Sequence, residues 1–105
     1  MFKAIILLTR RPDMSHDEFV RWWLDDHVPL ASDLPHVRRA ILNVVDEGFD
    51  ENGVDGVSEL WFDSRADFEA ANASEVGQAM AADSLAHVSA RVRLIVTDHD
   101  VTPAP

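Results

Sequence analysis

The chain contains no cysteine among its 105 residues. Disulfide bonds, thiolate metal sites and a cysteine nucleophile are therefore excluded. The sequence also contains no Gly-x-Ser-x-Gly pattern, so a serine nucleophile of the hydrolase type is not indicated. Any chemistry is left to histidine and carboxylate side chains.

Basic residues are scarce as well. Nine lysines and arginines stand against 19 aspartates and glutamates, which gives a formal net charge of −10. Nucleic acids and anionic membranes attract clustered positive charge, so neither is expected as a partner. The N-terminal apolar run, Ala4 to Leu8, is far shorter than a membrane span and has no small-residue cleavage site. We therefore expect a cytoplasmic protein.

Metal-ligand spacing is missing too. No two histidines have His-x-x-x-His spacing, and the residues of Asp98-His99-Asp100 would alternate between faces in an extended chain. We expect no metal site.

The apolar pattern predicts alternating strands and helices in one domain, residues 1–105. Ser15 and Glu18 form a capping box, which starts the first helix at His16. Pro29 lacks the N–H that would bond the Asp25 carbonyl, so this helix should end or kink just after His27. An acidic connection, residues 46–56, is expected to face solvent. Strands are predicted over 2–9, 37–45, 57–62 and 90–98, with further helices starting after a Ser64 cap and near Ser74.

This order of elements is typical of the α+β, ferredoxin-like β-α-β-β-α-β fold, in which helices cover one face of an antiparallel sheet. The strands at 2–9, 57–62 and 90–98 have apolar side chains on both faces. The face without helices should therefore also be hidden from water. We expect a homodimer in which the two open sheet faces meet to form a dimeric α/β barrel.

One histidine lies on the apolar side of the first predicted helix. Phe19, Trp23 and His27 follow one another at the i, i+4 and i+8 spacing of an α-helix. One interpretation is a core histidine with hydrogen-bonded ring nitrogens. The other is a general acid or base, because imidazole is the side chain best suited to proton transfer near neutral pH.

Two polar residues lie on the neighbouring strands of a predicted hairpin. Glu59 and Asn43 are expected to share a face of the sheet. In the functional interpretation Glu59 orients His27 as a catalytic carboxylate, and Asn43 binds a carbonyl oxygen or oxyanion of the substrate. In the structural interpretation Glu59 forms an ion pair with an arginine. The arginines considered are Arg39, Arg91 and Arg93.

Aromatic and histidine side chains supply the remaining candidates. Trp23 and Trp61, with Trp22, are either core residues or walls of an apolar pocket for a flat, oxygenated ligand. His87 either reaches the same cleft or interacts favourably with the C-terminus of its helix. His16, next to Asp17 at a helix start, is expected to be solvated.

The chain resembles the EthD family of the dimeric α/β-barrel superfamily. The family usually has an acidic pair where this chain has Asp83-Ser84. The resemblance implies that His27 is the helix histidine that faces a cleft between helix and sheet, with no established cofactor or metal. It rests on residues 3–9, on Phe19, Trp23, His27, Pro29 and Leu30, on Glu59-Leu60-Trp61-Phe62 and on Ala82-Asp83.

The resemblance implies a range of activities, from lactone methylisomerases and dehydratases or decarboxylases of polyketide-derived aromatics to accessory proteins of ether degradation. Two hypotheses follow. In the first, the protein is a small cofactor-free isomerase or lyase. His27, assisted by Glu59, moves a proton in an oxygenated aromatic or lactone-like metabolite, and Trp23, Asn43, Trp61 and His87 bind it. In the second, it is a non-catalytic binding or accessory protein for a partner oxygenase in catabolism.

Overall fold

The computed structural model describes residues 1–46 and 53–102. Strands and helices follow one another along this part of the chain in the predicted β-α-β-β-α-β order. The strands are β1 (Phe2–Arg10), β2 (Arg39–Val44), β3 (Gly56–Phe62) and β4 (Val88–Val96). The helical segments are α1 (His16–Arg21), the π-helix η1 (Trp22–His27), α2 (Val28–Ala31), α3 (Arg65–Ala73) and α4 (Glu75–His87).

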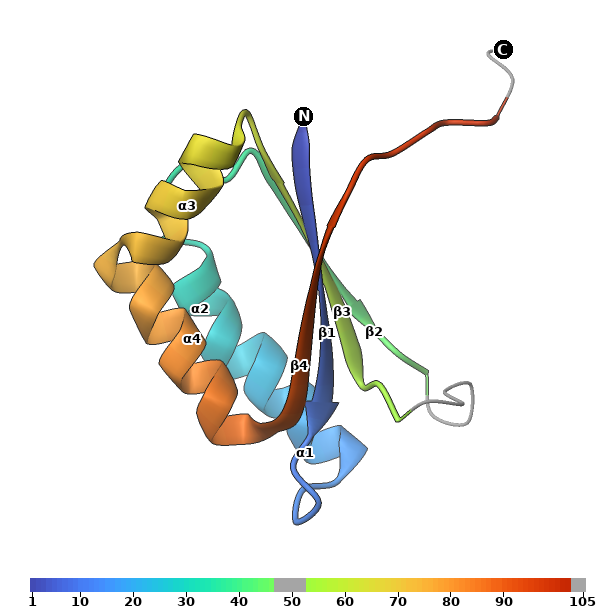
Figure 1. Ribbon diagram of the computed structural model, residues 1–105. Helices are drawn as coiled ribbons and strands as arrows, with labels where there is room; N and C mark the ends of the chain where they lie inside the picture. The colour runs from blue at the N-terminus through green and yellow to red at the C-terminus, as the bar shows by residue number, and fades with distance from the viewer. Residues whose placement is uncertain (47–52, 103–105) are drawn as a thin grey trace.

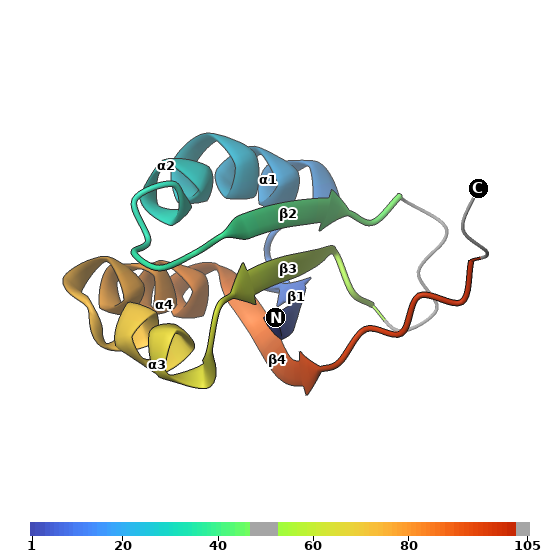
Figure 2. The same cartoon turned by 90° about the horizontal axis from the view of Figure 1, so that it is seen from above.

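The strands form an antiparallel sheet in the order β2-β3-β1-β4. The helices lie on one side of this sheet, and the other side is open (Figure 1). Seen from above, α1 and α2 form one row and α3 and α4 form a second row (Figure 2). The ferredoxin-like α+β fold expected from the sequence is confirmed.

Strand alternation assigns each side chain to the helix-covered face or to the open face. Ala4 pairs with Leu60, and both are buried under the helices, whereas the neighbouring pair Ile5 and Glu59 points the other way. The open face carries Lys3, Ile5 and Leu7 of β1, Arg39, Ile41 and Asn43 of β2, Val57, Glu59 and Trp61 of β3, and Val92 and Leu94 of β4.

Two buried apolar clusters lie on the helix-covered face, and Ile6 packs against both of them. Area removed from water stabilises the fold by roughly 25 cal/mol per Å², so these clusters hold the helices on the sheet. One cluster contains Ala4, Leu34, Leu60, Phe62, Phe68 and Ala71. The other contains Leu8, Phe19, Trp22, Trp23 and Val88.

The predicted helix starts are confirmed by their caps. The Ser15 hydroxyl accepts a hydrogen bond from the Glu18 backbone N–H, and the Glu18 carboxylate accepts one from the Ser15 N–H. Ser64 and Ser74 accept from the third residue after them in the same way. Each such cap contributes about 1 kcal/mol to helix stability, so these serines set the first residue of three helices.

The prediction that the first helix ends or kinks just after His27 is confirmed as a change of helix type, because η1 ends at His27 and α2 begins at Val28. Helical structure continues past His27, because η1 is a π-helix in which the Val28 N–H bonds the Trp23 carbonyl. Pro29 has no N–H for the Asp25 carbonyl, and a wider turn just before it relieves this mismatch. The α-helical spacing assumed for Trp23 and His27 therefore does not hold, and the π-turn instead places His27 beside Trp22, five residues earlier.

The expectation of a solvent-facing acidic connection is confirmed for Asp46, which is exposed, and is wrong for Asp55. Residues 47–52 of this connection lie outside the described part, but Asp55 is only 2% exposed. Its carboxylate accepts hydrogen bonds from the Arg10 backbone and guanidinium and contacts Nδ1 of His16 at 2.8 Å. His16 is therefore not solvated, and the cluster ties together the end of β1, the start of α1 and the start of β3.

Candidate active site

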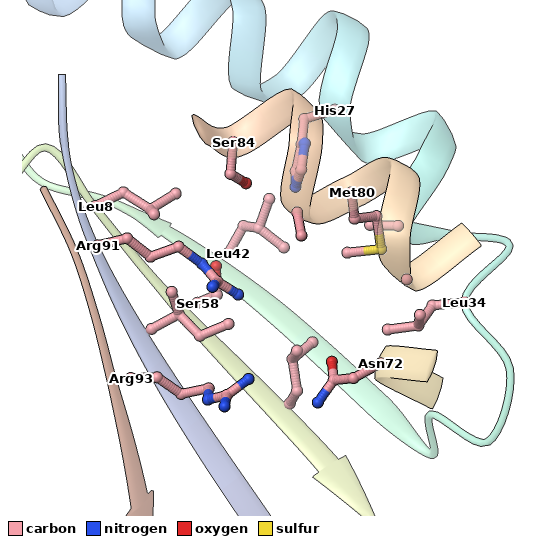
Figure 3. Close-up of a pocket in the computed structure, with 15 residues that line it drawn as sticks. Leu8, His27, Leu34, Leu42, Ser58, Asn72, Met80, Ser84, Arg91 and Arg93 are labelled. Carbon is pink, nitrogen blue, oxygen red and sulfur yellow. The ribbon is translucent and has the colours of Figure 1, made fainter. Parts of the chain in front are cut away.

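A cavity of about 120 Å³ lies between the helix-covered face and the helices η1, α2 and α4. It separates the two buried clusters, since Leu8 of one cluster and Leu34 and Leu60 of the other line it. Figure 3 shows His27 entering this space from the helix side and Arg91 and Arg93 entering it from β4. The lining also includes Ile6, Ala31, Leu42, Ser58, Asn72, Gly77, Met80, Ala81 and Ser84.

Small side chains leave this space open. Gly77, Ala81 and Ser84 lie one helical turn apart along α4, and Ser58 faces them from β3. Gly77 cannot carry a side chain, because a Cβ there would lie 2.2 Å from the Ala71 carbonyl oxygen. The close contact of α3 with α4 therefore requires this glycine.

His27 and Asp83 form a hydrogen-bonded pair at the cavity wall. Nδ1 of His27 lies 2.9 Å from Oδ2 of Asp83, and the His27 side chain is 8% exposed. The indole Nε1 of Trp22 donates to the same carboxylate at 3.2 to 3.3 Å. A carboxylate cannot donate in its ionised form, so the His27 Nδ1 is the donor and the lone pair of a neutral ring is on Nε2.

The other ring nitrogen of His27 faces the cavity. No group of the described chain hydrogen-bonds to Nε2, yet every fully buried side-chain nitrogen or oxygen in this part of the chain has a partner. Nε2 must therefore contact open space, and the cavity provides it (Figure 3). An imidazole held by a carboxylate on one side and open on the other is the arrangement of a general base.

Aromatic packing fixes the orientation of this pair. The Trp22 ring lies between His27, at a centroid distance of 5.2 Å, and His87, on which it stacks at 4.4 Å. Nδ1 of His87 donates to the Asp83 backbone carbonyl at 2.7 Å. His87 thus supports Trp22 and the Asp83 turn, but it does not line the cavity.

Glu59 does not lie beside His27, which corrects the expectation of a catalytic His27–Glu59 pair. The β3 register puts Ser58 and Leu60 on the helix-covered face, so Glu59 between them is on the open face. Its carboxylate bonds Lys3 at 3.0 Å and Asn43 at 3.1 Å rather than any arginine. These hydrogen bonds from Asn43 and Lys3 hold the pKa of Glu59 below its ordinary value.

The other predicted binding residues are placed apart from the cavity as well. Asn43 shares a face with Glu59 as expected, but that face is the open one. Trp61 is on the same side, with Lys3 and Arg39 over its ring. Trp23 is buried in the core, where a Cβ on Gly56 would lie 2.7 Å from its ring. Of the six predicted site residues, only His27 lines the cavity.

The structure adds site residues that the sequence interpretation did not select. Asp83 entered only as part of the family segment, although it stands four residues before His87 on one helix face. Arg91 and Arg93 entered only as partners for Glu59. The sequence did contain a signal for these arginines. They alternate with apolar residues in the predicted strand, so both had to lie on the same face of β4.

Two further observations concern metal-ligating groups and membrane-spanning helices among the described residues. Within residues 1–46 and 53–102, no group of three histidine or acidic side chains is arranged to hold a metal ion. None of the helices there has the length and apolar character needed to cross a membrane.

Several solved structures share this fold. An EthD family protein from Bacillus halodurans superposes with a TM-score of 0.78 at 18% identity, covering 94% of this chain and 100% of that one. A dimeric ferredoxin-like protein of unknown function from Thermobifida fusca gives 0.74 at 17%, covering 90% and 88%. The hydroxynitrile lyase from Passiflora edulis gives 0.72 at 18%, covering 94% and 95%. At these identities the likeness establishes the fold alone.

Sequence comparison identifies the family directly. No curated protein matches the chain. The family model for the EthD domain matches residues 11–89, a segment that runs from before α1 to the start of β4 and includes both His27 and Asp83. The chain belongs to the EthD domain family.

Proposed function

We propose that the protein is a small enzyme in which Nε2 of His27 removes a proton from, and returns it to, an oxygenated metabolite bound in the cavity. The observation that carries this proposal is the His27–Asp83 hydrogen bond at the wall of an otherwise mainly apolar cavity. Isomerisation, dehydration and decarboxylation of an aromatic or lactone-like compound all need such a proton transfer.

Asp83 has a defined part in this chemistry. As the acceptor of the Nδ1 proton it keeps the imidazole in one tautomer, and it stabilises the imidazolium that forms when Nε2 takes a proton. The Trp22 indole, which donates to the same carboxylate, holds it in position. The low exposure of His27 also keeps bulk water from competing for the proton.

The cavity limits the size of the substrate. Its volume is comparable with the roughly 150 Å³ of an apolar cavity that binds benzene, so a compound with one small ring fits. The hydroxyl groups of Ser58 and Ser84 are available in the lining to bond its oxygens. This geometry favours a small lactone or a singly substituted aromatic over a fused-ring polyketide.

Proton exchange in heavy water tests the proposal without knowledge of the physiological reaction. A panel of small lactones, aryl ketones and keto acids is incubated with the protein, and loss of acidic C–H signals is followed by proton NMR. We expect exchange that His27→Gln reduces by at least about 100-fold and that the control variant His99→Gln, at an exposed position, retains. Binding without exchange, or exchange that a folded His27→Gln variant retains, contradicts the enzyme and favours the binding or accessory hypothesis.

We also propose that the working form is a homodimer joined through the open face. Val92 and Leu94 are 50% and 46% exposed there, and Ile5, Leu7 and Val57 add further apolar surface. The similar Thermobifida fusca protein is described as dimeric. Sedimentation equilibrium measures the mass, and a monomer at micromolar concentration contradicts this part of the proposal.

A further inference from the structure

Two arginines of the edge strand β4 point toward the helices rather than away from them. Arg91 pairs with Leu8 and Arg93 with Ile6 in the sheet register, and all four residues line the cavity. In Figure 3 the two guanidinium groups extend from β4 into the space that His27 enters from the opposite wall. Both arginines line a mainly apolar cavity while remaining exposed to solvent, so two positive charges border this space.

Among the described residues neither arginine forms an ion pair, which is also true of Arg21 and Arg39, but only Arg91 and Arg93 line the cavity. The ion pairs that lysine and arginine form among the described residues use Lys3, Arg10, Arg11, Arg38 and Arg65. No carboxylate of the described chain pairs with Arg91 or Arg93, although acidic residues outnumber basic ones by 19 to nine. The carboxylate of Asp83, at the cavity wall, is hydrogen-bonded to His27 and Trp22 and not to either arginine.

The two guanidinium groups also disfavour each other. Burial lowers the pKa of Arg91, and the positive charge of Arg93 lowers it further. Arg93 lies over the Phe68 ring, with 5.2 Å between its guanidinium carbon and the ring centroid, which holds it at this position. An anion between the two arginines would relieve the repulsion and form charge-assisted hydrogen bonds with both.

We infer that Arg91 and Arg93 form an anion-binding subsite, and that the substrate is a small aromatic or lactone-like compound bearing a carboxylate. The planar fork of a guanidinium matches the two oxygens of a carboxylate. With the carboxylate at β4, the ring lies across Ile6, Leu42 and Leu60, and its far end points toward Nε2 of His27. This inference rests on the proposed function for the role of His27, but the anion subsite has its own test.

Binding of benzoate tests the subsite, with benzamide as the neutral analogue of nearly the same shape. Isothermal calorimetry or ligand-observed NMR is used on the intact protein. We expect benzoate to bind at least about tenfold more tightly than benzamide, the difference that one charge-assisted contact provides. Arg91→Gln and Arg93→Gln should each remove most of this preference and leave benzamide binding unchanged.

A matched control separates the subsite from general electrostatics. Arg65→Gln makes the same charge change on the surface of α3, where the side chain is 79% exposed, and should leave benzoate binding unchanged. Glutamine keeps the apolar stem of the side chain, and melting curves of each variant confirm folding. Equal binding of benzoate and benzamide by the unaltered protein, or an equal loss in Arg65→Gln, overturns the inference. Failure to bind benzoate at about 10 mM overturns it as well.

The same measurements distinguish this inference from the proposed function. His27→Gln should keep the preference for benzoate, because its imidazole is on the opposite wall, while losing proton exchange on a reactive carboxylate-bearing substrate. If arginine variants lose benzoate binding but His27→Gln retains exchange, the subsite stands and the catalytic role falls. If His27→Gln loses exchange but the arginine variants bind benzoate normally, the catalytic role of His27 stands and the anion subsite is wrong.

Discussion

The two faces of the sheet both carry a polar network next to an indole ring, but in different surroundings. On the open face, Lys3, Glu59 and Asn43 bond one another, and Trp61 packs beneath Lys3 and Arg39. On the helix-covered face, Asp83 accepts from both His27 and Trp22 at the edge of a cavity. Both networks therefore combine a carboxylate with a tryptophan, but one lies on the open face and the other lies under the helices at the edge of a cavity.

The difference lies in what each network leaves unpaired. On the open face the Glu59 carboxylate and the Lys3 ammonium neutralise each other, and the pKa of Glu59 falls because Asn43 and Lys3 stabilise its charged form. On the helix-covered face His27 keeps Nε2 free, and Arg91 and Arg93 have no carboxylate partner among the described residues. A network with free groups beside a cavity is suited to a ligand, and a self-paired one is suited to an interface.

The largest expected effect compares one residue from each face. His27→Gln should reduce proton exchange by about 10²- to 10⁴-fold, the usual contribution of a general base. Glu59→Gln should change the rate by less than about twofold, because strand alternation places it across the sheet. Initial rates by NMR measure both. A large loss of exchange rate in a folded Glu59→Gln variant would show that Glu59 takes part in catalysis.

The next effect concerns acid stability. Burial would raise the pKa of Asp55, but hydrogen bonds from the Arg10 backbone, His16 and the Arg10 guanidinium lower it overall. Its stabilising contribution is therefore complete above its unfolded pKa of about 3.9 and disappears as pH falls through the lower folded value. Asp55→Asn should cost about 3 kcal/mol near neutral pH, the range for breaking a buried ion pair.

Urea denaturation at a series of pH values measures this contribution. Glu59→Gln is the matched comparison, because its pKa is also lowered but its side chain is 25% exposed, so the cost should stay at or below about 1 kcal/mol. The gap between the two variants should narrow as pH falls toward 3. An equal loss of unfolding free energy in the two variants at neutral pH would show that burial does not make the Asp55 carboxylate more important for stability than the Glu59 carboxylate.

A smaller effect is expected for the partner of the catalytic imidazole. Asp83→Asn removes the charge that stabilises imidazolium and permits the wrong ring tautomer, so exchange should fall at least about tenfold. Histidine NMR should show the change as a new nitrogen shift for His27. An unchanged rate with a changed spectrum would show that Asp83 acts on structure alone.

The smallest effect concerns assembly through the open face. Leu94→Asp should weaken self-association by at least about tenfold, because an unpaired carboxylate would be buried at the interface. Leu85→Asp is the control, since this α4 residue is 70% exposed and away from the open face. Sedimentation of both variants gives the masses. An unchanged mass for Leu94→Asp would place the interface elsewhere.

Local signals predicted much of the fold. The serine caps fixed three helix starts, since a cap depends on residues at most three positions apart. The alternation in β2 and β3 correctly placed Asn43 and Glu59 on one face, but it left open which face the helices cover. That choice depends on how the whole sheet packs, which is why the Glu59 role failed while the strand itself was right.

The sequence by itself determined the order of elements and the helix caps, because these follow from apolar periodicity and from residues at most three positions apart. It also put His27 on a buried side of the first helical segment, although the α-helical spacing used for that prediction is replaced by a π-helix. Only the tertiary structure decided what His27 contacts. Asp83 is 56 residues away and reaches it through the packing of α4 on η1, and the π-turn before Pro29 gives the ring its direction. Arg91 and Arg93 complete the cavity from an edge strand that joins β1 by long-range pairing.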